Sequence, residues 1–148
     1  MILLGAYQGL RIHEVAKFKG EDIEVDRLRV VGKGGTDVKL PLHALLAAEA
    51  VDYPARGFWF PSYDLDGPVT ASNVGKVVAA AMRRAGIDGA TAHQLRHWYG
   101  TQVLRSAGGN VRVAQELLRH AMVATTQVYC EISLDEQRAA IDGLPAAC

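Results

Sequence analysis

Residues 22–41 read DIEVDRLRVVGKGGTDVKLP, and polar and apolar side chains alternate along this stretch with a period of two. That period is typical of β-strands that place one face on a core. Turn-forming residues at Asp26-Arg27 and at 32–35 divide the stretch into three runs, at 22–25, 27–31 and 37–41. The pattern predicts a small three-stranded antiparallel meander.

The chain on both sides of this meander has the apolar spacing of helices. One helix is predicted over residues 3–18, with an interruption near Gly9, and another over 42–53. The fold class is therefore predicted to be α+β and mainly α-helical, with the three-stranded antiparallel sheet at one edge.

Three polar residues after the meander mark helix starts, because their side chains can accept hydrogen bonds from the first helical turn. They are Thr70, Thr91 and Asn110. A capping box at 133–136 predicts a last helix in the same way. The helix after Thr70 is expected to bury a stripe made of Val74, Val77, Val78, Ala81 and Met82.

The composition is that of an ordinary globular protein. Of the 148 residues, 49% are hydrophobic and 22% are charged, which argues against a disordered chain, a collagen-like repeat or a disulfide scaffold. No apolar run approaches the ~18 residues of a membrane helix, and the first residues lack the features of a signal peptide. Because the chain has only Cys130 and Cys148, a reduced, cytoplasmic protein is expected, with one domain over 1–148.

The formal net charge is zero, but the charges are unevenly distributed along the chain. Residues 1–70 have a balance of −2, residues 71–130 a balance of +5, and residues 131–148 a balance of −3. Six of the seven basic residues in the middle segment are arginine, the side chain suited to bidentate contacts with phosphate. The sequence therefore predicts a basic middle that can face a nucleic acid, followed by an acidic tail.

Six polar residues could together carry out phosphoryl transfer. Two arginines can donate to non-bridging phosphate oxygens, a lysine and histidines can move protons, and a tyrosine hydroxyl can attack phosphorus. No group of carboxylates stands ready for Mg²⁺, so cationic side chains would stabilise the transition state, and neither a metal nor a cofactor is expected. The set consists of Arg11, Lys33, His93, Arg96, His120 and Tyr129.

Chemistry alone leaves other interpretations open. The two histidines His93 and His97 are spaced like zinc ligands, but a glutamine follows the first where a zinc enzyme would need a glutamate base. The glycine turn at 32–36 lacks the spacing of a P-loop and joins two predicted strands. Each residue of the set could instead be structural, as Arg11 would be if it paired with Glu14.

Four segments, taken in order, resemble the tyrosine recombinase (phage integrase) family. Arg followed three residues later by Glu, the pattern His-x-x-Arg, and a His nine residues before a Tyr are weak signals singly and specific together. The resemblance covers nearly the whole chain. The segments are Gly9-Leu-Arg11-Ile-His-Glu14-Val, Val31-Gly-Lys33-Gly-Gly with Val38-Lys-Leu-Pro41-Leu, His93-Gln-Leu-Arg96-His97, and Gln115-Glu-Leu-Leu-Arg-His120 leading to Thr125-Thr-Gln-Val-Tyr129.

The resemblance implies that four of these residues act on or near the phosphate. Arg11 and Arg96 correspond to the phosphate clamp, and His120 to a further donor to the phosphate. Glu14 matches an acidic position that supports the first arginine. This set would hold the phosphate in place for attack.

The resemblance also implies which residues react. Tyr129 corresponds to the nucleophile that forms a 3′-phosphotyrosyl link, and His93 to the residue that helps to move its proton. Lys33 corresponds to the general acid that protonates the leaving 5′ oxygen. The expected enzyme is a site-specific recombinase or integrase of a phage or mobile element, which cleaves and rejoins double-stranded DNA.

In this family the full-length protein is expected to assemble as a tetramer on DNA, whereas the present chain is expected to be monomeric without DNA. The N-terminal core-binding domain of the family is expected to be absent from residues 1–148. The tail, about 131–148, is expected to pack either in its own domain or on a neighbouring protomer.

The chain departs from the family pattern in two places within these segments. Arg119 stands where glycine is usual, and it is expected to alter the turn before His120. Trp98-Tyr99 also replaces a less aromatic pattern. One alternative is therefore a truncated, non-catalytic DNA-binding relative, and a more distant one is a topoisomerase-like enzyme that relaxes DNA.

Overall fold

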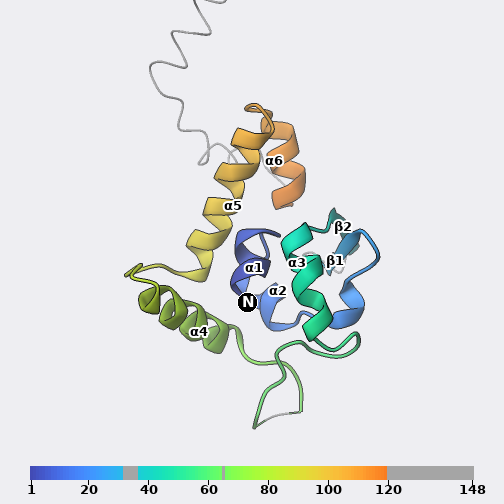
Figure 1. The fold of residues 1–148 in the computed structure, drawn as a ribbon, viewed down its shortest axis with the longest axis vertical. Helices are drawn as coiled ribbons and strands as arrows, with labels where there is room; N and C mark the ends of the chain where they lie inside the picture. Colours follow the sequence, from blue (N-terminus) through green and yellow to red (C-terminus); the bar gives the residue numbers. More distant parts are fainter. Residues whose placement is uncertain (32–36, 65, 120–148) are drawn as a thin grey trace, which may run out of the picture.

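The computed structural model describes residues 1–31, 37–64 and 66–119. Short elements come first and longer helices follow (Figure 1). The fold is mainly helical with a small antiparallel sheet, so the predicted fold class is confirmed. In chain order the elements are α1 (Ile2–Ala6), α2 (Ile12–Ala16), the 3₁₀ turn η1 (Gly20–Asp22), β1 (Arg27–Val31), β2 (Asp37–Pro41), α3 (Ala44–Glu49), the 3₁₀ turn η2 (Ala50–Asp52), α4 (Ala71–Arg84), α5 (Ala92–Ser106) and α6 (Val111–Leu118).

The described part of the sheet has two strands, so the prediction of a three-stranded meander is wrong in its first strand. That run contributes a single bridge, between Ile23 and Leu28. Its first residue, Asp22, instead ends the 3₁₀ turn η1, and the Asp22 carboxylate accepts a hydrogen bond of 3.0 Å from the Lys19 N–H. Val25 is completely exposed, so no burial of its side chain holds the run against β1.

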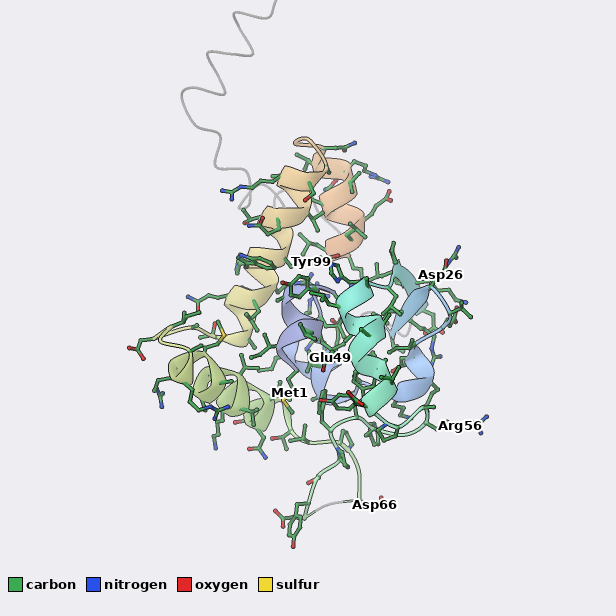
Figure 2. The ribbon with its side chains drawn as sticks, in the orientation of Figure 1. Met1, Asp26, Glu49, Arg56, Asp66 and Tyr99 are labelled. Carbon is green, nitrogen blue, oxygen red and sulfur yellow. The ribbon has the colours of Figure 1, made fainter. Side chains whose placement is uncertain are left out.

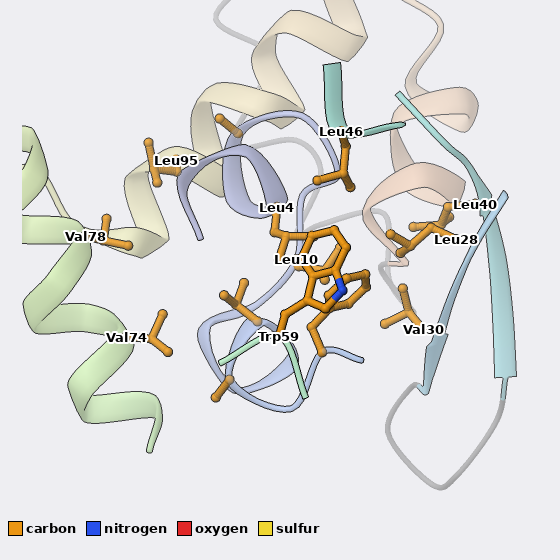
Figure 3. Packing of buried hydrophobic residues seen from close by; sticks show 14 residues of the cluster. Leu4, Leu10, Leu28, Val30, Leu40, Leu46, Trp59, Val74, Val78 and Leu95 are labelled. Atoms are coloured by element: carbon orange, nitrogen blue, oxygen red, sulfur yellow. The ribbon is translucent and has the colours of Figure 1, made fainter. Parts of the chain in front are cut away.

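The core lies between the sheet, the α1–α2 segment and α4 (Figure 3). Leu28 and Leu40 are register partners on β1 and β2, and both side chains are buried. From the opposite side, α4 contributes the buried side chains of Val74 and Val78. Val77 was predicted in the same stripe but is exposed, because only the narrow row of positions four apart faces the core.

Three of the predicted helix starts are confirmed, and the fourth, the capping box at 133–136, lies outside the described residues. Each predicted N-cap side chain accepts a hydrogen bond from the first helical turn: Thr70 from the Asn73 N–H at 3.2 Å, Thr91 from the Gln94 N–H at 3.3 Å, and Asn110 from the Arg112 N–H at 3.1 Å. In addition, the predicted helix over 42–53 is present as α3 followed by η2. Within the described residues, no helix is long and apolar enough to cross a membrane.

The predicted interruption near Gly9 separates α1 from α2. Helix α5 passes α1 and contacts α6 and α4, so it links this interruption to the end of the described chain (Figure 1). This crossing brings Arg96 of α5 into contact with the turn at Gly9.

Candidate functional site

The turn between α1 and α2 is shaped by a glycine that no other residue could replace without strain. Gly9 has a φ of 60°, in the left-handed region that glycine adopts readily. A Cβ atom there would lie 2.4 Å from Cδ1 of Tyr99, whose ring packs against the turn from α5. Figure 2 shows Tyr99 where α5 passes α1. The Gly9 carbonyl is thereby held toward α5 and α6.

Arg96 connects this turn to the end of α6. Its side chain extends from α5 and is buried, with the residue only 3% exposed. One Nη donates to the carbonyl oxygen of Gly9 and the other to that of Leu118, the last residue of α6. Carbonyls at the end of a helix lack partners within it. Arg96 therefore fixes two backbone segments that are far apart in the sequence around one buried positive charge.

Arg11 begins α2 as its N-cap residue, and Glu14 closes a capping interaction with it. The Glu14 carboxylate accepts a bond of 2.7 Å from the Arg11 backbone N–H. It also accepts a longer bond of 3.3 Å from Nη1 of the Arg11 guanidinium. The Arg11 side chain remains 38% exposed, whereas that of Glu14 is 6% exposed. The Arg11 guanidinium is thus held weakly at the surface of the site.

Arg119 binds the same carboxylate more closely. Its Nη1 lies 3.0 Å from Oε1 of Glu14 and its Nη2 lies 2.8 Å from Oε2, a bidentate ion pair that is nearly buried. Nη2 also donates to the Gly9 carbonyl at 3.3 Å. The residue has φ 55° and ψ 44°, so Arg119 adopts the left-handed conformation in which glycine often ends a helix.

These contacts determine the ionisation of Glu14. Burial raises the pKa of the carboxyl, but the positive charge of Arg119 and the hydrogen bond from the Arg11 N–H lower it by more. The pKa of Glu14 therefore lies below its ordinary value, and the group is a carboxylate at neutral pH. One carboxylate is shared by two guanidinium groups, which leaves a positive charge between them.

His93 and His97 meet on α5, one helical turn apart. Their Nε2 atoms are 2.6 Å apart, so one nitrogen donates and the other accepts. Burial, then the charges of His93 and Arg96, lowers the pKa of His97. His93 thus has a neutral imidazole as its partner at neutral pH, which the sequence set did not include.

The structure connects two of the predicted residues, and a third lies on the same helix as one of them. Arg11 and Arg96 are connected through Arg119, which binds Glu14, the partner of Arg11, and the Gly9 carbonyl that Arg96 also contacts. His93 precedes Arg96 by three residues on α5, and positions three apart share a helix face. The predicted residues Lys33, His120 and Tyr129 lie outside the described residues, as does the predicted tail 131–148.

The sequence prediction missed Arg119 as a member of the site. It treated this residue as a departure that would disturb the turn, whereas the backbone at Arg119 has the glycine-like conformation and the side chain binds Glu14. The sequence offered only a weak signal, namely the unusual arginine itself at a position where glycine is usual. The distance of 105 residues between Glu14 and Arg119 concealed the ion pair.

The fold and the arginine site define a helical domain that concentrates positive charge at one backbone turn. The chain belongs to the phage integrase family, whose sequence model matches residues 1–136. The resemblance predicted from the sequence motifs is thereby confirmed.

Curated relatives are tyrosine recombinases. The chain is 31% identical over 150 residues to tyrosine recombinase XerA of Thermococcus kodakarensis, covering 95% of this chain and 52% of the relative. It is 36% identical over 149 residues to tyrosine recombinase XerD of Caulobacter vibrioides, covering 90% of this chain and 48% of the relative. The chain thus spans about half the length of these relatives.

Solved structures agree. An integrase from mycobacterium phage Brujita superposes with a TM-score of 0.74 and 40% identity, over 94% of this chain and 48% of that one. XerH recombinase bound to its difH substrate, in a pre-cleavage complex, superposes with a TM-score of 0.77 over 96% of this chain and 45% of that one. The identity to XerH is 22%, so that likeness concerns the fold alone.

Proposed function

We propose that this chain is the catalytic domain of a site-specific tyrosine recombinase that cleaves and rejoins double-stranded DNA. The observation that carries the proposal is the convergence of Arg11, Arg96 and Arg119 on the Gly9 turn, where Glu14 is shared by two of them. Such a turn favours an anion with several oxygens, and a phosphodiester offers two non-bridging ones. The relatives that are 31% and 36% identical to this chain are named tyrosine recombinases, which also supports the proposal.

The proposed reaction conserves phosphodiester bonds. The Tyr129 hydroxyl attacks phosphorus, so that a bond from phosphorus to the tyrosine oxygen forms and the bond to the 5′ oxygen breaks. His93 takes part in removing the tyrosine proton, and Lys33 donates a proton to the leaving oxygen. Rejoining reverses these steps and needs no external energy source.

The arginines would stabilise the charge that develops on the phosphate. Arg11, whose side chain is partly exposed, would donate directly to a non-bridging oxygen. Arg96 and His120 complete the clamp. The charge of Arg96 is buried, where solvent ions screen it less than they screen a surface charge.

The setting of this reaction is part of the same proposal. The full-length protein would act as a tetramer on DNA in the cytoplasm, and the present chain would be monomeric without DNA. Contacts to the phosphate backbone would dominate its binding, so that the affinity would fall steeply with salt.

The experiment uses duplexes that carry a nick and randomised flanking sequence, so that a cleaved strand is lost and the covalent adduct accumulates. Wild-type protein should form an adduct that survives denaturing electrophoresis, and Tyr129→Phe should form none. Tyr63→Phe is a matched control, because Tyr63 is completely exposed and lies outside the proposed site. An adduct that persists in Tyr129→Phe would refute the assignment of the nucleophile.

The second candidate is a non-catalytic DNA-binding relative, which Arg119 favoured in the sequence. The structure removes part of that support, since Arg119 fits the turn with a glycine-like backbone. Wild-type protein that binds duplex DNA and yields no adduct would favour this candidate. Relaxation of plasmids without preference for a site would instead indicate a topoisomerase-like activity.

A further inference from the structure

Arg119 is an unusual residue to end a helix. It is the only non-glycine residue with a positive φ in the described part of the chain. A side chain in the left-handed region is strained relative to glycine, which commonly occupies this position. In addition, its buried Nε has no hydrogen-bond partner among the described residues. Backbone strain and an unsatisfied buried donor both lower stability, so the contacts of this arginine have to offset these two costs.

The contacts of Glu14 indicate what the arginine does. Arg119 binds both carboxylate oxygens, at 3.0 and 2.8 Å, whereas the Arg11 guanidinium reaches one oxygen at 3.3 Å. Glu14 is nearly buried, and a buried carboxylate requires a close cationic partner. Without Arg119, the guanidinium of Arg11 would be drawn into that role.

We propose that Arg119 is a positioning residue that holds the Glu14 carboxylate and so leaves the Arg11 guanidinium to bind a DNA phosphate. This inference rests on the proposed function, because it assigns the phosphate to Arg11. It extends that function by naming a residue that acts through Glu14 without contacting the DNA.

Two variants distinguish an effect of the Glu14 charge from an effect of the shape of the Arg119 side chain. In Arg119→Met the Glu14 carboxylate pairs with Arg11, and one cationic contact to DNA is lost. In the double variant Glu14→Gln/Arg119→Met there is no carboxylate to capture Arg11, and the net charge equals that of the wild type. Glutamine can also still accept the hydrogen bond from the Arg11 N–H that closes the capping interaction. The double variant should therefore regain the binding that the single variant loses.

The test measures fluorescence anisotropy of a short labelled duplex as a function of salt, which does not depend on cleavage. Arg119→Met should bind about tenfold more weakly, and the slope of log affinity against log salt should fall by about one. The double variant should return to within about threefold of wild type, with the original slope. Arg27→Met is the matched control, because Arg27 forms an exposed ion pair with Asp26 and lies outside both the site and the basic middle of the chain.

Two results would overturn the inference: wild-type binding by Arg119→Met, or a double variant as weak as the single one, which would indicate a structural role only. If circular dichroism shows that Arg119→Met is unfolded, Arg119→Lys replaces it, since lysine keeps the charge and lacks the bidentate geometry. The lysine variant should show a smaller loss of affinity, and wild-type affinity would count against the inference.

The same variants are assayed for the covalent adduct. An intact adduct in wild type, together with no rescue by the double variant, would refute the role of Arg119 and leave the proposed function standing. Rescued binding without any wild-type adduct would refute cleavage and leave the positioning role. A wild-type protein that does not bind duplex DNA would refute both.

Discussion

Replacement of Gly9 by alanine tests how the arginine site is held together. Two costs add at this position. The φ of 60° imposes about 1–2 kcal/mol on a residue with a side chain. The new Cβ would also lie 2.4 and 2.6 Å from two atoms of the Tyr99 ring, and overpacking of this kind costs about 1–3 kcal/mol. We expect Gly9→Ala to lower the free energy of unfolding by about 2–5 kcal/mol.

A matched variant separates the two costs. Gly86 has a φ of 78°, and nothing lies within 4 Å of a Cβ built there. Gly86→Ala should therefore show the backbone cost alone, about 1–2 kcal/mol. The difference between the variants, about 1–3 kcal/mol, measures the collision with Tyr99. Removal of the ring in Gly9→Ala/Tyr99→Ala should eliminate that part of the cost, measured against Tyr99→Ala alone.

Urea denaturation at 25 °C, followed by circular dichroism, provides the free energies of unfolding. Equal losses for Gly9→Ala and Gly86→Ala would refute the reasoning, because they would show that the Tyr99 ring moves aside freely. A displaced Gly9 carbonyl would also weaken the bonds from Arg96 and Arg119. Gly9→Ala should therefore bind duplex DNA more weakly even under conditions where it is fully folded.

Three further predictions concern pH and packing. The pKa of Glu14 is lower in the folded than in the unfolded chain, so its ionised form contributes stability above the unfolded pKa, and this contribution is lost as pH falls through the folded pKa. Glu14→Gln should remove this pH dependence. It should also lower the free energy of unfolding by about 3–5 kcal/mol in urea titrations near pH 7, because it leaves Arg119 buried without a carboxylate. The pKa of His97 lies below its ordinary 6.5, so the folded state resists protonation and the free energy of unfolding should fall as pH drops below 6.5. In His97→Gln the melting temperature should depend less on pH between pH 5 and 7. A pH dependence equal to that of the wild type would count against the prediction. Leu28→Ala should lower the free energy of unfolding by about 2–5 kcal/mol through a cavity in the core, whereas Val25→Ala, at an exposed position of the unformed strand, should change it by less than about 0.5 kcal/mol.

Features that depend on neighbouring residues were predictable from the sequence. The N-caps at Thr70, Thr91 and Asn110 form because a side-chain oxygen reaches an N–H two or three residues further on. The interruption at Gly9 was equally visible, since glycine disfavours a continuous helix. The strand at 22–25 was not formed because alternation alone does not supply burial, and Val25 has none.

The candidate site was predictable in its residue types and not in its connections. Motifs selected Arg11 and Arg96, but the bond from Arg96 to the Gly9 carbonyl joins positions 87 residues apart. The partnership of Arg119 with Glu14 depends on one backbone conformation at the end of α6, which local patterns do not reveal for an arginine. Contacts of this range are created by the packing of α5 against α1, and a single sequence contains no direct record of them.

The zero net charge of the chain conceals basic side chains with two different roles. Residues 71–130 contain seven basic residues, of which Arg96 and Arg119 turn inward and five are exposed, namely Lys76, Arg83, Arg84, Arg105 and Arg112. Salt screens exposed charges over about 8–10 Å, so the five can attract a distant polyanion only at low ionic strength. Buried charges are screened much less, and Arg119 is already paired with Glu14, so it is Arg96 that should act on a bound phosphate at salt concentrations that cancel the attraction. For the proposed recombinase, added salt should therefore weaken DNA binding far more than it slows cleavage by protein that is already bound.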